Sequence, residues 1–353
     1  MVVASRECVM ESDDNMGEKQ GPITDSFTAR RNHTYIPFNP TTTSFHPSIP
    51  TMSSPLPKTT ITHSKSGATA ELYPIGATVT SFKTSKGREL IFLSRLAKLD
   101  GSKAVRGGIP LVFPQFAHPD KSMPQHGFFR TNLWTIDTST AYDHDDKAGI
   151  HCTLTLSQVS KSRGGKWDVD KTDFDFAADY HVQITADTLT TVLTITNTGS
   201  TAFPFQTLKH TYFQVQGHEA TNGETTNVTG LAGYSVEDKI TNEEYVQDDT
   251  PIVFDKNVDR IYTPPADKPS VEAVVNTGGG TSIVVGGTGT VNGQSVPVSC
   301  VVWNPFAEKA AAMSDFGDDQ YNDMVCVEPG IIQNVPDLEA GQACVFTQTV
   351  KGL

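Results

Sequence analysis

The chain reads RGGIPLVFPQFAHPDKSMPQHGFFRTNLW from Arg106 to Trp134. The glycines of this stretch let the backbone turn sharply, the prolines stiffen it, and the aromatic side chains anchor it to a core. This framework carries polar groups at Arg106, Gln125, His126 and Arg130. A rigid loop that presents a few polar groups is typical of a small-molecule site. The alternative is an ordinary loop whose arginines face water.

Short runs with strand character surround this loop and are separated by Gly, Pro, Asn and Asp. We expect strands at 68–73, 78–84, 89–94, 152–159, 180–185, 189–197, 281–285, 296–303 and 343–350. Residues 180–197 form a predicted hairpin that turns at 186–187, and the glycines at 278–280 and 286–287 are predicted turns. Only 308–313 suits one or two helical turns. The pattern predicts an all-β chain, a large β-sandwich or barrel.

The composition limits the classes of function. A chain of 353 residues suits one large all-β domain or two average domains, and 37% hydrophobic residues suffice for a core. A formal charge of −13 argues against nucleic-acid binding, which needs a basic surface. No apolar run approaches the roughly 18 residues of a membrane span. An anionic ligand would therefore need local positive charge, which Arg106 and Arg130 could supply.

Residues 1–58 are polar, rich in Ser, Thr and Pro, and without sustained periodicity. We expect a disordered tail there and a single domain at 59–353. Met52 is a possible alternative start of the chain. The first 20 residues lack a continuous apolar segment and hold five acidic residues, which disfavours a secretory signal or a transit peptide. The expected location is the cytoplasm.

The five cysteines are scattered and form no C-x-x-C pair, so reduced thiols are expected rather than disulfides or a zinc site. The acidic cluster Asp315, Asp318, Asp319 and Asp323 lacks the spacing of a calcium loop, and we interpret it as a solvated turn. Cys326 lies two residues from a glutamate, but nothing nearby would activate it, so a small buried hydrophobic residue is expected. No metal ligand set is predicted.

Two later positions could carry acid/base chemistry. His210 stands in TLKHTYF, a run with strand propensity, where a histidine is commonly structural. Glu328 ends the apolar run VCVE at a predicted Pro-Gly stop. Burying an unpaired carboxylate is costly, so Glu328 needs a partner, a function, or backbone N–H groups that satisfy it. Together the two residues would suit proton transfer near pH 7.

Between about residues 60 and 350 the chain contains six short motifs in this order: RGGIP, PQHGF, KHTYF, DRIY, WNPF and CVEPG. With them the chain resembles the aldose 1-epimerase (galactose mutarotase) superfamily, and within it the glucose-6-phosphate 1-epimerase branch. The resemblance implies a β-supersandwich with a carbohydrate site on the concave face of a sheet. It also implies an isomerase that needs no cofactor.

The resemblance implies a role for each matching residue. Glu328 would be the general base that takes the proton of the anomeric hydroxyl, and His210 the general acid that protonates the ring oxygen. The substrate-binding residues would be Arg106, Gln125, His126, Arg130 and Asp259, with the two arginines at the phosphate end. His126 could instead hold loop carbonyls, and Asp259 could cap a turn.

The expected protein is a monomeric cytoplasmic hexose-6-phosphate mutarotase whose only partner is a small sugar phosphate. Two alternatives remain open at this point. One is a mutarotase for unphosphorylated aldoses, and the other is a non-catalytic carbohydrate-binding module. A matched acid and base disfavours the second, because binding alone does not need them.

Overall fold

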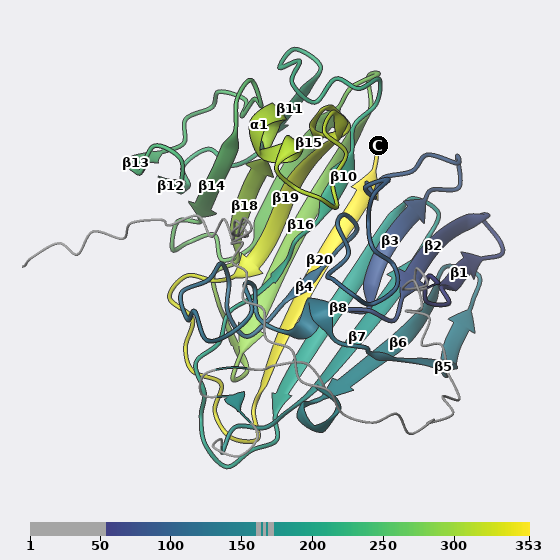
Figure 1. The fold of residues 1–353 in the computed structure, drawn as a ribbon, viewed down its shortest axis with the longest axis vertical. Helices are drawn as coiled ribbons and strands as arrows, with labels where there is room; N and C mark the ends of the chain where they lie inside the picture. Colours follow the sequence, from purple (N-terminus) through teal and green to yellow (C-terminus); the bar gives the residue numbers. More distant parts are fainter. Residues whose placement is uncertain (1–53, 160–163, 165–166, 169–172) are drawn as a thin grey trace, which may run out of the picture. The chain divides into compact units, whose positions relative to one another are not determined.

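The computed structural model describes residues 54–159, 164, 167–168 and 173–353. These residues belong to one compact unit made almost wholly of β-strands, which confirms the predicted all-β sandwich (Figure 1). Most of the predicted N-terminal tail lies outside the described residues. Its last positions contact the domain: Leu56 donates its backbone N–H to the Leu99 carbonyl (2.8 Å), and Lys58 forms an ion pair with Glu71 (2.6 Å).

The described strands form three antiparallel sheets. The smallest has the order β1 (Thr59–His63), β2 (Ala68–Tyr73), β3 (Thr78–Lys83). The eight-stranded sheet has the order β13 (Glu243–Val246), β12 (Ser235–Asp238), β14 (Val258–Thr263), β18 (Ser299–Asn304), β19 (Met324–Ile331), β9 (Thr207–Lys209), β4 (Leu111–Val112), and β10 (Tyr212–Gln214) also pairs with β19.

The nine-stranded sheet has the order β11 (Thr226–Thr229), β15 (Val271–Thr277), β16 (Ser282–Val291), β20 (Ala343–Gly352), β8 (Thr188–Asn197), β7 (Phe176–Ile184), β6 (Ala148–Thr155), β5 (Thr135–Asp143), and β17 (Gln294–Ser295) pairs with β16. The helical segments whose residues are all described are η1 (Phe129–Thr131), η2 (Leu156–Gln158), α1 (Phe306–Ala311) and η4 (Gln320–Asn322). None of the helices in the described ranges has the length and apolar character to cross a membrane.

The two large sheets pack face to face. Lys209 on β9 is fully buried and reaches the other sheet, where its Nζ donates to the carbonyls of Thr191 (2.8 Å) and Phe346 (3.0 Å). A Cβ added at Gly287 of β16 would lie 2.9 Å from the Cβ of Pro329 on β19. Strand β19 is buried along its whole length, because one face meets the nine-stranded sheet and the other is covered by loops and α1.

Most of the predicted strands are confirmed, and the hairpin forms from β7 and β8. Three boundaries are wrong. The predicted strand at 89–94 makes only isolated bridges. The strand expected to reach Val159 ends at Thr155, because Thr155 and Gln158 form a capping box that starts η2. The strand expected from Val296 begins only at Ser299.

Two predicted turns are also wrong. Strand β16 runs straight through Gly286 and Gly287, so neither glycine reverses the chain. Gly287 lets the two large sheets approach closely, whereas a Cβ on Gly286 would meet Thr349 of the neighbouring strand β20. Strand β19 likewise continues through Pro329 and Gly330 to Ile331. A Cβ on Gly330 would lie 2.8 Å from that of Leu208, so glycine lets β9 pack beside it.

The loop between Arg106 and Trp134 is joined to the eight-stranded sheet by its backbone. Its strand β4 pairs with β9, and the carbonyls of Pro110 and Gly108 accept the N–H groups of His210 and Tyr212 (both 3.0 Å). Gly127 has φ +69°, and a Cβ there would lie 1.9 Å from the Phe113 carbonyl oxygen. As predicted, aromatic packing anchors the loop, for example between Phe113 and Phe129, whose ring centroids are 4.3 Å apart.

Candidate active site

His210 and Glu328 face each other on neighbouring strands. His210 lies in the break between β9 and β10, and both of these short strands pair with β19. The register is the same on either side of the break, with Leu208 opposite Gly330 and Tyr212 opposite Cys326. His210 therefore stands across from Glu328, on the face of the sheet that lies away from the nine-stranded sheet.

The pair is close but not hydrogen bonded. His210 Nδ1 lies 3.2 Å from Glu328 Oε1, yet this nitrogen and both carboxylate oxygens are buried without a hydrogen bond. Glu328 is 1% exposed and His210 is 9% exposed. Backbone N–H groups, the structural alternative considered for Glu328, do not satisfy its carboxylate. Buried polar atoms without partners are rare and mark positions where a ligand or a reaction supplies the partner.

Burial changes the proton affinity of Glu328. It raises the pKa of this carboxyl well above the ordinary value, and the nearby Asp259 raises it further. Arg130 acts in the opposite direction. Without a ligand the carboxyl is therefore biased towards its neutral, protonated form, as expected for an acid taken out of water.

His126 is held beside His210 by the loop. Its backbone has φ +62°, and its Nδ1 accepts the N–H of Ala117 (3.2 Å), so Nε2 carries the proton of the neutral ring. Burial, and next Arg130, lowers the pKa of His126 to about 3, which keeps the ring neutral. The ring stands edge-on to His210 at 5.8 Å between centroids. His126 thus combines a loop-holding contact with a free N–H donor at the site.

Arg106 is fixed by two side chains. Its Nε donates to Asp315 Oδ1 (3.1 Å) and its Nη1 donates to the hydroxyl of Tyr212 (3.3 Å). Tyr212 and then Asp315 raise the pKa of Arg106 despite its partial burial. The guanidinium is therefore charged and oriented before any ligand binds.

Arg130 lies on η1, where Nη2 donates to the Gln125 carbonyl (2.9 Å) while its Nε is buried without a partner. Burial lowers the pKa of Arg130 to about 10, so the group is charged at neutral pH but poorly compensated. The contact with Gln125 also lets Arg130 hold the loop in place. The Gln125 side chain itself is exposed.

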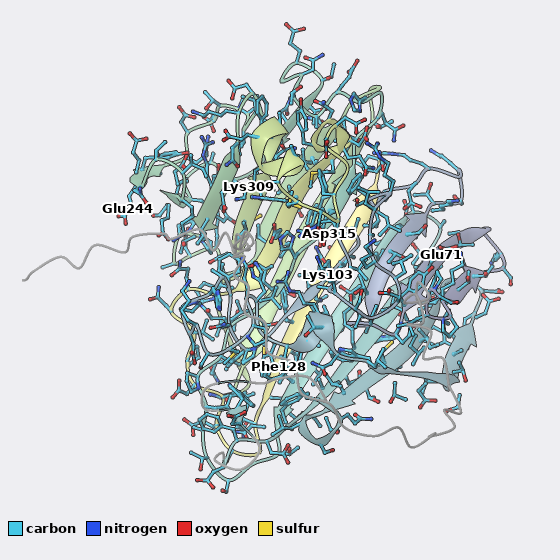
Figure 2. All side chains as sticks on the ribbon, viewed as in Figure 1. Glu71, Lys103, Phe128, Glu244, Lys309 and Asp315 are labelled. Atoms are coloured by element: carbon cyan, nitrogen blue, oxygen red, sulfur yellow. The ribbon has the colours of Figure 1, made fainter. Side chains whose placement is uncertain are left out.

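Asp259 on β14 lies opposite Trp303 on β18. Its carboxylate is 3.8 Å from Lys309 Nζ, and the same ammonium lies 5.9 Å from the centre of the Trp303 ring. Lys309, labelled in Figure 2, extends from α1 beside β18. Burial raises the pKa of Asp259, and Lys309 opposes that shift. Asp259 is therefore a strand residue with a lysine partner and does not cap a turn.

Electrostatic coupling brings most of the predicted residues together. Burial lowers the pKa of His210 well below its usual value, and His126, Arg130 and Arg106 lower it further. Asp259 is close enough to Glu328 to raise the pKa of its carboxyl. Gln125 is the predicted site residue whose side chain, being exposed, does not belong to this cluster.

Further residues contact the cluster without having been predicted for it, among them Tyr212, Trp303, Lys309 and Asp315. For Tyr212 the signal was its place two residues after His210, which gives the two side chains the same face of a strand. Trp303 and Lys309 belong to a neighbouring strand and helix, and sequence spacing could not place them beside His210.

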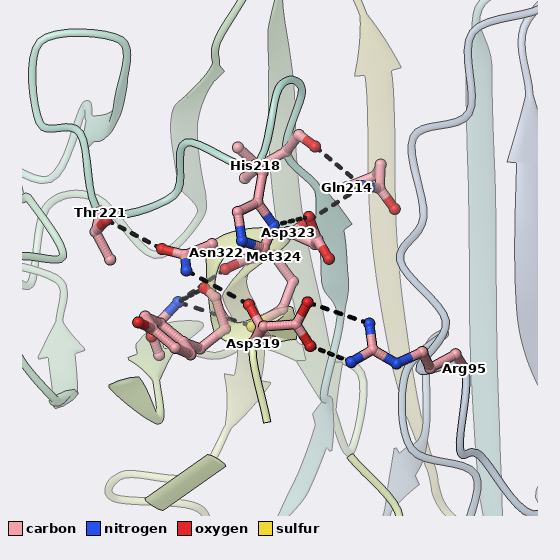
Figure 3. A network of polar contacts seen from close by, with 11 residues as sticks. Arg95, Gln214, His218, Thr221, Asp319, Asn322, Asp323 and Met324 are labelled. Carbon is pink, nitrogen blue, oxygen red and sulfur yellow. Dashed lines mark hydrogen bonds and ion pairs between the residues drawn. The ribbon is translucent and has the colours of Figure 1, made fainter. Parts of the chain in front are cut away.

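The interpretation of the acidic cluster as a solvated turn is confirmed for Asp318 and Asp319, which are exposed in a turn, and is wrong for Asp315. Asp315 is buried against Arg106. Asp319 pairs with Arg95, and Asp323 contacts His218 Nδ1 at 2.7 Å (Figure 3). These carboxylates therefore join separate loops by ion pairs and are not arranged around one cation.

Among the described residues, one group could hold a metal: the ligand atoms of His210, Cys326 and Glu328 lie within 4.8 Å of one another. Burial raises the pKa of Cys326 well above its usual value, and that of Glu328 as well. A raised pKa favours the protonated form of each group, and these protons compete with a metal ion. A hollow of about 520 Å³ lies elsewhere and is lined by residues that include Arg88, His218 and Asp323. Its His218–Asp323 pair is more exposed to solvent than the pair of His210 and Glu328.

Comparison with known proteins identifies the family of the chain. A model of the aldose 1-epimerase family matches residues 57–350. Two proteins named "Putative glucose-6-phosphate 1-epimerase" are similar to the chain. The one from Cenchrus ciliaris is 32% identical over 278 residues, which cover 77% of this chain and 78% of that protein. The one from Escherichia coli is 28% identical over 277 residues, which cover 78% and 84%.

A solved structure of a "putative mutarotase" from Salmonella typhimurium superposes with a TM-score of 0.64 at 22% identity. The superposition covers 81% of this chain and 87% of that one, which shows the shared fold. The family match extends over nearly all the described residues and includes every strand of the site. The chain belongs to the aldose 1-epimerase family.

Proposed function

We propose that this protein is a hexose-6-phosphate mutarotase that interconverts the α and β anomers of glucose 6-phosphate. The observation that carries the proposal is the buried carboxylate of Glu328, which lacks hydrogen bonds and stands 3.2 Å from His210. Arg106 and Arg130 lie close enough to alter the pKa of that histidine. The names of the two relatives support the same substrate class.

The reaction needs one proton removed and one proton added. Glu328 takes the proton of the anomeric hydroxyl while His210 gives a proton to the ring oxygen, so the C1–O5 bond breaks and the open-chain aldehyde forms. Rotation about C1–C2 presents the other face of the aldehyde. Closure reverses both transfers, so the site returns to its starting state without a cofactor or a covalent intermediate.

Substrate binding would prepare the pair for this step. In the empty site burial favours neutral His210 and protonated Glu328. A sugar hydroxyl bonded to Glu328 favours its carboxylate, because hydrogen bonds to the charged form lower a carboxyl pKa. A phosphate dianion near Arg106 and Arg130 offsets the positive charges that lower the pKa of His210. Both effects favour the base form of Glu328 and the acid form of His210.

The arginines also account for substrate preference. A planar guanidinium binds phosphate oxygens in pairs, and each charge-assisted hydrogen bond contributes about 1.5–3 kcal/mol. Two such groups favour a phosphorylated sugar by roughly 10²- to 10⁴-fold at about 1.4 kcal/mol per decade, less where solvent screens them. In a chain of net charge −13 this selectivity depends on local placement.

Anomer exchange measured by NMR tests the proposal. Purified protein should accelerate exchange of glucose 6-phosphate far more than exchange of glucose at equal concentration. Equal acceleration of both sugars would favour a mutarotase for unphosphorylated aldoses. Binding of either sugar without accelerated exchange would indicate a carbohydrate-binding module and overturn the enzymatic assignment.

A further inference from the structure

The ring of His210 rests on Tyr212. The two rings are stacked, with centroids 4.8 Å apart and planes 11° from parallel. Trp303 meets the His210 ring edge-on at 5.8 Å between centroids. Since His210 Nδ1 has no hydrogen bond, these aromatic contacts fix the plane of its imidazole.

The hydroxyl of Tyr212 faces a different partner. It accepts a hydrogen bond from Arg106 Nη1 (3.3 Å), while Asp315 holds the other side of the guanidinium. Tyr212 is 2% exposed, so water does not compete strongly for this contact. The side chain of Tyr212 therefore contacts both His210, the proposed general acid, and Arg106, a proposed phosphate-binding residue.

A row of residues across the sheet supports this position. Cys326 on β19 pairs with Tyr212 on β10 on one side and with Trp303 on β18 on the other. The centroids of the tyrosine and tryptophan rings lie 6.0 Å apart with their planes at 81°, and Cys326 belongs to the same buried cluster.

We infer that Tyr212 is a positioning residue that joins phosphate recognition to acid catalysis: its ring orients His210 and its hydroxyl orients Arg106. This inference rests on the proposed function and deepens it. It gives the ring and the hydroxyl separate duties, because the stack involves only the ring and the arginine contact only the oxygen. Two substitutions can therefore separate them.

Tyr212→Phe keeps the ring and removes the hydroxyl. We expect KM for glucose 6-phosphate to rise about two- to tenfold, the usual effect of one lost hydrogen bond, with kcat and the slow rate on glucose nearly unchanged. Tyr212→Leu also removes the stack. We expect kcat to fall by about 10- to 100-fold for both sugars, because a misplaced catalytic group loses rate without being removed.

Tyr262→Phe is a matched control, since Tyr262 is equally buried in the same sheet but packs into the core between the large sheets. It should change neither KM nor kcat. Histidine NMR of Tyr212→Leu should show altered His210 ring shifts and a different pH profile, whereas Tyr212→Phe should match wild type. These spectra remain informative if the wild-type protein proves inactive on both sugars, an outcome that would refute the proposed function alone.

Unchanged His210 shifts and kcat in folded Tyr212→Leu would overturn the positioning role of the ring. A Tyr212→Phe variant that loses rate on both sugars equally would overturn the separate role of the hydroxyl.

Discussion

Replacing Glu328 by Gln should inactivate the protein and stabilise it at the same time. Loss of a general base lowers turnover by roughly 10²- to 10⁴-fold. The stability gain follows from the raised pKa of the buried carboxyl. Above the unfolded pKa, near 4.5, the unfolded chain releases this proton while the folded protein keeps it, so wild-type stability falls as pH rises. Glutamine does not titrate and escapes that loss.

The loss is about 1.4 kcal/mol per pH unit over the window in which the folded protein holds the proton. Each pH unit of that window corresponds to roughly 3–6 °C in Tm at about 2–4 °C per kcal/mol. Thermal melts of wild type and Glu328→Gln from pH 4.5 to 7.5, with NMR exchange assays on the same samples, measure both effects. The difference in Tm should be small at the acidic end and grow with pH.

Glu89→Gln provides a control for which the expected change in Tm has the opposite sign. The Glu89 carboxylate accepts the backbone N–H groups of Phe82 (2.8 Å) and Ile91 (3.0 Å), so its loss should lower Tm and leave activity intact. A Glu328→Gln variant with near-wild-type turnover would remove Glu328 from the mechanism. A Tm difference that does not change with pH would refute the argument from its pKa.

His210→Ala should reduce turnover by about 10²- to 10⁴-fold, and combining it with Glu328→Gln should cost less than the product of the single effects, because the two act as a unit; additive losses would contradict this. Arg130→Ala should raise KM for glucose 6-phosphate about 10- to 100-fold and spare the rate on glucose; equal loss on both sugars with a lower Tm would make it a loop clamp only. Burial lowers the pKa of Lys209, so denaturant melts should show wild-type stability rising between pH 7 and 9 while Lys209→Met stays flatter; parallel profiles would refute this. A chain shortened to begin at Met52 retains the whole family match and should keep full activity; insoluble or inactive protein would show that residues 1–51 are needed.

The sequence by itself determined the class of fold. Alternation along 180–197 predicted the hairpin of β7 and β8, because a half-buried strand needs apolar residues at every second position. The predicted ends of strands were wrong where a residue type such as glycine occurs both in turns and at close contacts inside strands. Gly287 looks like a turn residue, but it lies inside β16 because neighbouring atoms leave no room for a Cβ. Only the packed sheets contain that information.

The motifs also indicated the candidate site residues, including His210 and Glu328. Tertiary structure alone decided how those residues meet. The shared register of β9 and β10 on β19 puts the histidine opposite the glutamate, and burial removes the water that would otherwise set their pKa values. Tyr212 and Trp303 acquire their role in the same way, since a pairing between strands distant in sequence brings their rings against His210. Local sequence fixes which face of a strand a side chain occupies, whereas its neighbours and its exposure to solvent depend on contacts between distant parts of the chain.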